Sequence, residues 1–294
     1  MTLESAQQQL QLQLKNLYAE REAANITDWV MEHVTGKKKI ERLLDKHMLL
    51  PENVQAQLQQ ITKELRTHRP VQYVLGETWF CGMKFFVNEH VLIPRPETEE
   101  LVDWVVEESE ELKVKSEKLL DVGTGSGCIP IALKKKLGSS ASITSVDVSK
   151  DALQVAQKNA DALGADVSFL HIDFLNEDGW EGLPVFDCIV SNPPYIKRSE
   201  EKDMGKNVLD FEPGIALFVP DEDALLFYRK IALFAKEHLA KNGFIFLEIN
   251  EALGKGVTEL YNSFGYVVEL RKDLQGKDRM MKVNLIPSTQ EKIC

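Results

Sequence analysis

Short apolar runs alternate with amphipathic stretches along most of the chain, a pattern typical of parallel strands joined by helices. Four runs rich in aliphatic and β-branched residues predict buried strands at 118–122, 141–146, 167–172 and 186–191. The segment 128–137 predicts a helix, and a second helical pattern starts near Lys150. The C-terminal third adds two helices, at 223–240 and 252–264, and three strands, at 244–249, 266–270 and 280–286. The pattern therefore predicts an α/β fold with a seven-stranded sheet, whose last two strands pair antiparallel because only a short segment joins them.

The first 75 residues carry a different pattern. Glutamines alternate with leucines from Leu10 to Leu17, and leucines in such a stretch can line one helical face. Farther along, Val54, Leu58 and Ile61 recur at helical spacing. Two short apolar runs at 78–87, joined at Gly82, then predict a hairpin. We therefore expect three parts: a helical domain at 1–75, a β-hairpin linker at 76–92 and a sheet domain at 93–294.

Composition narrows the classes of function. The chain has 294 residues, of which 44% are hydrophobic, so a sizeable core is available. Its net charge of −11 argues against a general nucleic-acid binder, which normally shows a basic stripe. The four cysteines form no CxxC pair and predict no metal site; reduced thiols fit a cytoplasmic protein. The sequence shows neither a membrane-spanning run nor a signal-peptide pattern.

The four residues after the strand at 186–191 read Asn192, Pro193, Pro194 and Tyr195. Two prolines fix φ and supply no backbone N–H, so the turn is rigid and leaves the Asn192 side chain and nearby carbonyls free to accept hydrogen bonds. Acceptors beside the flat Tyr195 ring suit a planar NH₂ group, such as a carboxamide or the exocyclic amine of a base. A stiff turn that only ends a strand is the competing interpretation.

A glycine loop, Gly123-Thr124-Gly125-Ser126-Gly127, joins the first predicted strand to the helix at 128–137. Glycines let a ligand approach the backbone closely, and a helix N-terminus offers free N–H groups. A dinucleotide fingerprint would place its third glycine one residue later, at Cys128. The observed spacing is the one found in enzymes that use S-adenosylmethionine, so we expect these five residues to bind that cofactor.

Acidic residues end the next two predicted strands. Asp147 follows the loop by about twenty residues, where a carboxylate can accept hydrogen bonds from both hydroxyls of a ribose; capping the following helix is the alternative. Asp173 can accept from an adenine amine while Phe174 covers the ring, or it can simply cap a turn. Because carboxyl ends of parallel strands share one edge of the sheet, we expect the loop, both acids and Asn192 to meet there.

Arg95 and Glu97 are the last candidate site residues. Pro94 and Pro96 brace Arg95 in an extended segment, and Glu97 or Thr98 is expected to start a helix. A fixed arginine followed by acids would shape the mouth of a substrate site. An ordinary ion-paired helix start is the alternative.

Together these motifs resemble the protein-glutamine methyltransferases that modify peptide-chain release factors, the HemK/PrmC family. The resemblance covers nearly the whole length. Its segments are 69–76, 92–99, 121–127, 192–195, 211–213 and 276–279. The run Ile-Pro-Arg-Pro-Glu-Thr-Glu at 93–99, beside a helical N-terminal domain, is the most specific of them.

The resemblance implies a Rossmann-like S-adenosylmethionine-dependent methyltransferase. Its expected substrate is the glutamine of the Gly-Gly-Gln motif in class 1 release factors, gripped in part by the helical domain. Asn192, Pro193, Pro194 and Tyr195 would then form the catalytic turn, with Asn192 also bordering the cofactor. We expect a cytoplasmic monomer that has no direct contact with nucleic acid or membrane.

Two other functions stay open at the level of sequence. An adenine-N6 DNA methyltransferase, or an RNA amine methyltransferase, also presents acceptors to a planar NH₂ group, although it needs a basic face and a base-flipping module. The second is a catalytically silent module that binds a release factor. The intact Asn192 and the intact glycine loop argue against it.

Overall fold

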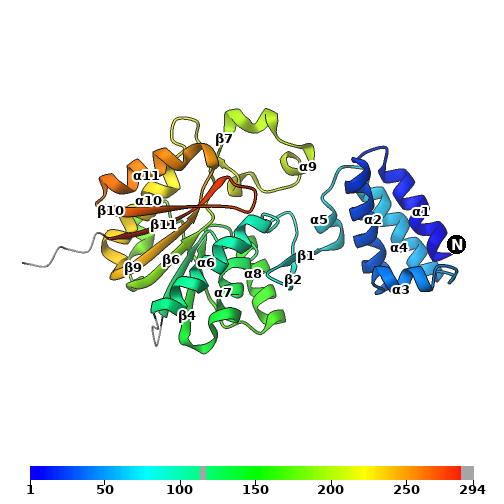
Figure 1. Ribbon diagram of the computed structural model, residues 1–294, viewed down its shortest axis with the longest axis horizontal. Helices are drawn as coiled ribbons and strands as arrows, with labels where there is room; N and C mark the ends of the chain where they lie inside the picture. The colour runs from blue at the N-terminus through cyan, green and yellow to red at the C-terminus, as the bar shows by residue number, and fades with distance from the viewer. Residues whose placement is uncertain (113–116, 286–294) are drawn as a thin grey trace, which may run out of the picture. The chain divides into compact units, whose positions relative to one another are not determined.

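The computed structural model describes residues 1–112 and 117–285 and divides into two compact units (Figure 1). The first unit comprises residues 1–77 and 204–211; the second comprises 78–203 and the described residues from 212 onward. Ile286, expected to end the last strand, and Cys294 lie outside the described residues. Within the two described ranges, we find no helix with the length and apolar character that crossing a membrane requires.

The first unit is built from the helices α1 (Leu3–Leu14), α2 (Glu20–Thr35), α3 (Lys39–Leu44), α4 (Glu52–Leu65), α5 (Val71–Leu75) and the short α9 (Lys206–Leu209). The apolar faces of α1, α2, α4 and α5 share one core, to which α3 and α9 contribute none of the described residues. Leu10 and Leu14 of α1 lie in this core together with Leu58 of α4, whereas Leu12 is 69% exposed. The glutamine-rich start therefore forms an amphipathic helix, although not every leucine lies on its apolar face.

A β-hairpin follows, formed by β1 (Glu77–Phe80) and β2 (Met83–Phe86). The two turn residues, Cys81 and Gly82, have φ angles of +48° and +71°. Positive φ at both central residues is the geometry of a type I′ turn, whose twist matches that of paired strands. Phe80 and Phe85 are buried in the core of the second unit, with their rings edge to face at 6.0 Å.

The second unit contains a seven-stranded sheet in the order β10-β11-β9-β6-β3-β4-β5. Its strands are β3 (Glu117–Val122), β4 (Ala141–Asp147), β5 (Ser168–His171), β6 (Phe186–Ser191), β9 (Leu239–Glu248), β10 (Tyr266–Lys272) and β11 (Asp278–Leu285). Only β11 runs against its neighbours, pairing antiparallel with both β9 and β10. The predicted seven-stranded α/β fold with one reversed strand is confirmed.

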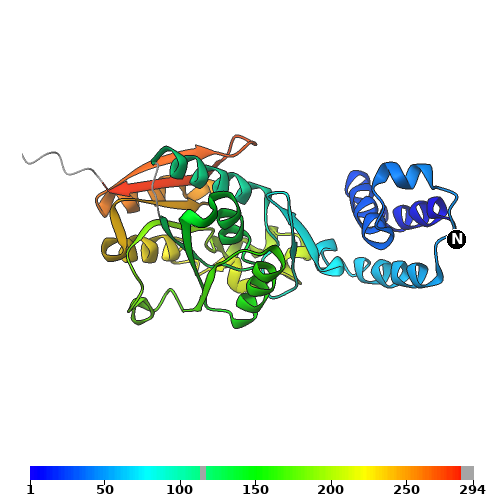
Figure 2. The same ribbon diagram turned by 90° about the horizontal axis from the view of Figure 1, so that it is seen from below.

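Helices cover both faces of the sheet (Figures 1 and 2). The helices α6 (Pro96–Leu112), α7 (Cys128–Leu137) and α8 (Lys150–Leu163) lie on one face, and α10 (Leu226–His238) and α11 (Gly254–Ser263) on the other. Successive strand residues point to opposite faces. Leu119 of β3 accordingly joins the core under α6 and α7, whereas Leu120 joins the core under α10 and α11.

Several element boundaries differ from the sequence-based expectation. The helix expected at 223–240 is α10, which ends at His238 because Leu239 already belongs to β9. The strand expected at 244–249 is correspondingly longer. Helix α6 begins at Pro96, where a proline suits the first helical position because its missing N–H has no helical partner anyway. After β6, a parallel pair of short strands, β7 (Ile196–Lys197) and β8 (Phe218–Val219), spans the long irregular segment.

Candidate active site

A cavity of about 280 Å³ lies at the carboxyl ends of β3, β4 and β6 and next to β5. Eight residues expected at the site line it: Gly123, Gly125, Asp147, Asp173, Phe174, Asn192, Pro193 and Pro194. Six others do not: Thr124, Ser126, Gly127, Tyr195, Arg95 and Glu97. The four strand-end motifs therefore share one space, as the topology of a parallel sheet requires.

The glycine loop presents an open backbone face to this cavity. Gly123, Gly125 and Gly127 have φ angles of +81°, +52° and +80°, in the left-handed region that favours glycine. A Cβ added at Gly123 or Gly125 would meet no atom within 4 Å, so a ligand can approach the loop closely there. A Cβ at Gly127 would instead lie 3.0 Å from Ile131 and 3.1 Å from Ala156. The open cradle fits a cofactor held against Gly123 and Gly125, and Gly127 serves close packing with α8.

Neighbouring elements hold this loop in place. The backbone N–H groups of Gly123 and Thr124 both donate to the carbonyl of Val146 in β4, at 2.9 and 3.2 Å. The buried side chain of Asn159, in α8, donates to the Ser126 carbonyl at 2.9 Å. These bonds set the loop conformation before any ligand binds.

Asp147 also shapes the loop. Its two carboxylate oxygens accept from the backbone N–H groups of Gly125 and Ser149, at 2.9 and 2.8 Å. Burial raises the pKa of Asp147, and the hydrogen bonds from Ser149 and Gly125 oppose that effect. Each carboxylate oxygen has further lone pairs, so Asp147 can still accept hydrogen bonds from a ligand in the cavity that it lines.

Asp173 and Phe174 differ in how much of each side chain is accessible to a ligand in the cavity. Asp173 is exposed at the cavity, and one oxygen accepts from the Leu175 backbone N–H at 3.0 Å. The Phe174 ring is 5% exposed and packs against Trp180 and Phe234, with centroids 5.5 and 5.1 Å apart. Little of that ring remains to cover a bound base, so its main contacts are in the core.

The Asn192 turn is tied to two further elements. Ser191, at the end of β6, donates through its hydroxyl to the Val122 carbonyl of β3 at 2.7 Å. The Asn192 amide donates from Nδ2 to the Thr98 hydroxyl at 3.1 Å. The Tyr195 hydroxyl donates to Glu248 at 3.2 Å, and burial raises the pKa of Tyr195. Asn192 therefore borders the cavity, whereas the hydroxyl of Tyr195 is directed to a buried carboxylate.

Thr98 and Glu248 are two buried residues that the motif analysis did not assign to the site. They are 2% exposed each, and the Thr98 hydroxyl donates to Glu248 at 2.6 Å. Glu248 is the last residue of the apolar strand β9. An acid at the carboxyl end of a strand is the same signal that pointed to Asp147, and it could have identified Glu248.

Arg95 and Glu97 pair with residues distant in sequence. Arg95 donates to Glu212 at 2.7 Å, and the Ile93 backbone N–H donates to the other oxygen of that carboxylate at 3.3 Å. Glu97 accepts from the Gln275 side chain at 3.1 Å. The Glu212 side chain is 1% exposed, so this ion pair anchors residues 93–95 to the segment after α9.

Asp121 is a further buried acid that motif spacing did not single out. It lies in β3 just before the glycine loop, has no exposed surface and accepts a hydrogen bond from the Ser145 hydroxyl. Its second oxygen, Oδ1, has no hydrogen-bond partner among the described residues. Burial raises the pKa of Asp121 to about 7, against the opposing effect of Ser145.

This raised pKa predicts a pH-dependent stability. Because the folded state holds the Asp121 proton more tightly than the unfolded state, its stabilising effect is complete below about pH 4 and is lost as pH rises through about 7. In the wild type we therefore expect the unfolding free energy to fall by about 2–4 kcal/mol across this pH range, and in Asp121→Asn we expect this fall to be absent. Urea unfolding at several pH values, without ligand, measures it. Asp161→Asn, at an exposed position of α8, is the control, and identical slopes in all three proteins would contradict the prediction.

Comparisons with known proteins address the identity of the chain. A PrmC N-terminal domain model matches residues 5–76, and a methyltransferase small domain model matches residues 105–211. The release factor glutamine methyltransferase of Flavobacterium psychrophilum is 43% identical over 274 residues, which are 92% of this chain and 95% of that protein. The enzyme of the same name from Bacteroides thetaiotaomicron is 40% identical over 272 residues, 92% of this chain and 96% of that protein.

A solved structure supports the fold. The catalytic domain of hMettl16, in complex with a MAT2A 3′UTR hairpin, matches with a TM-score of 0.54 and covers 81% of this chain and 84% of that chain. At 14% identity this likeness bears on the fold alone. The expected Rossmann-like methyltransferase architecture and the use of S-adenosylmethionine agree with these comparisons, and the resemblance inferred from the motifs is confirmed. The chain belongs to the family of release factor glutamine methyltransferases.

Proposed function

We propose that this chain transfers a methyl group to the side-chain amide nitrogen of the glutamine in the Gly-Gly-Gln motif of class 1 release factors. Both relatives described above carry the name release factor glutamine methyltransferase. The observation that carries the proposal in this chain is the shared cavity, which joins Gly123 and Gly125 to Asn192. A cofactor on the loop and a carboxamide at the turn would then occupy one continuous space.

The cofactor of the reaction is S-adenosylmethionine, whose sulfonium supplies an activated methyl group. We assign the loop from Gly123 to Gly127 to its binding, because its backbone is open to the cavity at Gly123 and Gly125 and the loop leads into the N-terminus of α7. Asp147 would accept hydrogen bonds from the ribose hydroxyls. Asp173, exposed at the same cavity, would accept from the adenine amine, with Phe174 beside it.

The protein must orient a poor nucleophile, because the lone pair of an amide nitrogen is delocalised into the carbonyl. We propose that the Asn192 side-chain oxygen and the Pro193 carbonyl each accept one N–H of the substrate amide. This directs the nitrogen lone pair at the methyl group, and such orientation contributes about 7–11 kcal/mol at best. No protein base is required, because a methylated, cationic amide loses its proton readily.

Four further residues belong to the substrate side in this proposal. Pro194 lines the cavity and stiffens the turn, and the Tyr195 ring would pack against the flat substrate amide. Arg95, held by Glu212 and 34% exposed, and Glu97 would border the entrance.

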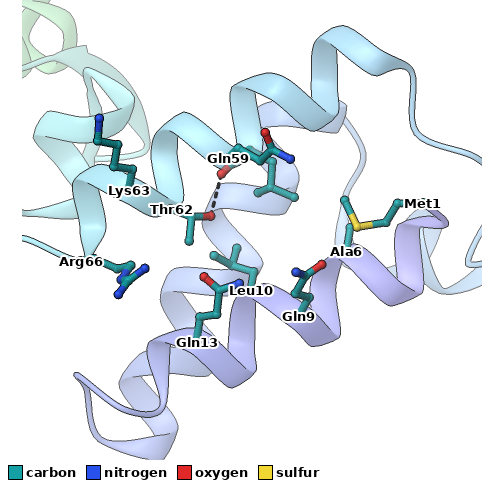
Figure 3. A pocket seen from close by; sticks show the side chains of 10 residues that line it. Met1, Ala6, Gln9, Leu10, Gln13, Gln59, Thr62, Lys63 and Arg66 are labelled. Atoms are coloured by element: carbon teal, nitrogen blue, oxygen red, sulfur yellow. Dashed lines mark hydrogen bonds between the residues drawn. The ribbon is translucent and has the colours of Figure 1, made fainter.

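For the helical domain at 1–75 we propose recognition of the release factor, with the hairpin at 76–92 as linker and 93–294 as the methyltransferase domain. Support comes from a second cavity of about 440 Å³ between α1 and α4 (Figure 3). Its rim is polar, with the side chains of Gln9, Gln13, Gln59, Lys63 and Arg66. Amides and cations together suit a partner surface that offers backbone carbonyls and carboxylates.

Charge reversal at this rim tests the assignment. In Lys63→Glu combined with Arg66→Glu, we expect KM for an intact release factor to rise about tenfold or more, because like charges would face the partner carboxylates. The kcat should stay close to wild type. Steady-state kinetics measure both values. Arg21→Glu with Lys46→Glu, exposed residues of the same unit outside the cavity, gives the same change in net charge and serves as control. An equal rise in KM in both double variants would contradict a specific role of the rim.

Mass spectrometry tests the proposed activity itself. After incubation of the enzyme with S-adenosylmethionine and a purified class 1 release factor, the peptide containing Gly-Gly-Gln should gain one methyl group on its glutamine. A parallel incubation with DNA and with RNA tests the adenine-N6 and RNA alternatives. Methylated nucleic acid with an unmodified release factor would overturn the proposal. Since one active-site cavity and one surface for the release factor suffice, we expect a monomer that acts in the cytoplasm.

A further inference from the structure

A chain of two hydrogen bonds leads from the buried Glu248 through the buried Thr98 to Asn192, and it joins three elements of the second unit. Asn192 follows β6, Thr98 lies in the first turn of α6 and Glu248 is the last residue of β9. The Asn192 Nδ2 atom donates to the Thr98 hydroxyl at 3.1 Å, and that hydroxyl donates to Glu248 Oε2 at 2.6 Å. Thr98 and Glu248 are both 2% exposed, so water does not compete for the bond between them.

The chemistry of the groups gives this chain a direction. A carboxylate has acceptor sites only, so an ionised Glu248 takes the single hydroxyl proton of Thr98. The Thr98 oxygen then has only lone pairs left and requires a donor, which Asn192 supplies from its NH₂ group. An amide that presents its NH₂ group to Thr98 directs its oxygen away from Thr98. The choice between the two amide orientations, which have nearly the same shape, is therefore made by Glu248 through Thr98.

Glu248 is itself held from two other sides. Its second carboxylate oxygen accepts the Tyr195 hydroxyl at 3.2 Å, and its backbone carbonyl accepts the buried Tyr228 hydroxyl at 3.2 Å. Burial raises the pKa of Glu248, but the hydrogen bonds from Thr98 and Tyr195 and the positive charge of Arg279 favour its ionised form. One carboxylate thus fixes both the amide and the aromatic residue of the Asn192 turn.

We propose that Thr98 and Glu248 are positioning residues, which hold Asn192 with its side-chain oxygen available to the substrate. The inference rests on the proposed function and deepens it, because it states how the site selects a primary carboxamide. A glutamine presents N–H groups, which the Asn192 oxygen accepts. A glutamate in the same place presents only oxygens, which that oxygen repels. The reversed amide would present NH₂ to NH₂ and lose the hydrogen bond to the nucleophile.

Removal of the Thr98 hydroxyl tests this role. In Thr98→Val, which has nearly the same shape, the Asn192 amide loses its partner, and we expect kcat to fall on the order of 100-fold. KM for a Gly-Gly-Gln peptide should change far less, and the affinity for S-adenosylhomocysteine should not change. Thr98→Ser restores the hydroxyl and should recover most of kcat. Thr258→Val removes a hydroxyl that bonds only within α11 and is the matched control. A kcat near wild type in Thr98→Val, or no recovery in Thr98→Ser, would overturn the proposal.

A second variant and a wild-type measurement keep the outcomes separate. Glu248→Gln offers an NH₂ group to either Thr98 or Tyr195, so it should also lower kcat while binding of S-adenosylhomocysteine persists. If Thr98→Val does not fold, Glu248→Gln tests the positioning role in its place. A wild-type kcat in Glu248→Gln would contradict that role. The wild-type enzyme is assayed first on the same peptide. If it does not methylate the peptide or the intact release factor, the proposed function fails, whereas an active wild type with an equally active Thr98→Val rejects only the positioning role.

Discussion

Replacing Asn192 with alanine is expected to lower kcat for release factor methylation about 10³-fold, the size of loss seen when a preorganised polar group that acts on the reacting atoms is removed. In our proposal the Asn192 oxygen accepts an N–H of the substrate amide and so helps orient its lone pair. The cavity walls that would hold the cofactor, Gly123, Gly125 and Asp147, do not depend on this side chain. Affinity for S-adenosylhomocysteine, measured by calorimetry, should therefore change little.

Two comparison variants sharpen this result. Asn192→Asp keeps an acceptor but places a carboxylate against the Thr98 oxygen, whose proton is already donated to Glu248, so it should also be nearly inactive. Asn262→Ala, at an exposed position of α11, should retain full activity. If Asn192→Ala turned over at a rate close to wild type, or if it lost cofactor binding to the same extent as activity, the assigned role of Asn192 would be wrong.

The fold was predictable where local pattern and tertiary environment agree. The helix at 128–137 and the strand at 186–191 have the bounds expected from sequence, because a glycine loop, a glycine cap and the proline turn punctuate both segments. The bounds of β9 were not predictable in this way. Its first residues, from Leu239, read as the continuation of a helix and become strand only because β6 offers a partner, with Phe186 opposite Leu239. Tertiary pairing overrides local preference there.

In the site, too, some features were predictable from sequence and others were not. The convergence of Gly123, Asp147, Asp173 and Asn192 followed from topology alone, since parallel strands bring their carboxyl ends to one edge. The link from Asn192 to Thr98 joins residues 94 positions apart, and the link from Thr98 to Glu248 joins residues 150 positions apart. No spacing rule connects such residues. The orientation of Tyr195 toward Glu248, and the pairing of Arg95 with Glu212, depend on packing in the same way.

Gly127→Ala is expected to destabilise the enzyme by about 2–5 kcal/mol and to weaken cofactor binding. Two effects add. Alanine at a φ of +80° costs about 1–2 kcal/mol. Its Cβ would also lie 3.0 Å from Ile131 and 3.1 Å from Ala156, and such overpacking typically costs about 1–3 kcal/mol. The contact with the Ile131 side chain can relax, but the approach of 3.2 Å to the Ala156 backbone requires α7 and α8 to separate. Because Gly127 caps α7, that movement displaces the loop that lines the cavity.

Gly164→Ala provides the matched comparison, because Gly164 caps α8 at a φ of +61° and a Cβ there meets no atom within 4 Å. It shares the backbone strain without the close packing, so its loss of unfolding free energy should be about 1–2 kcal/mol, with S-adenosylhomocysteine affinity unchanged. Urea unfolding and calorimetry on the two variants separate the effects. Equal destabilisation in Gly127→Ala and Gly164→Ala would show that position 127 requires glycine only because of its positive φ. Full cofactor affinity in Gly127→Ala would show that the loop keeps its conformation without close packing of α7 against α8. The loop geometry would then depend mainly on the hydrogen bonds from Gly123 and Thr124 to Val146.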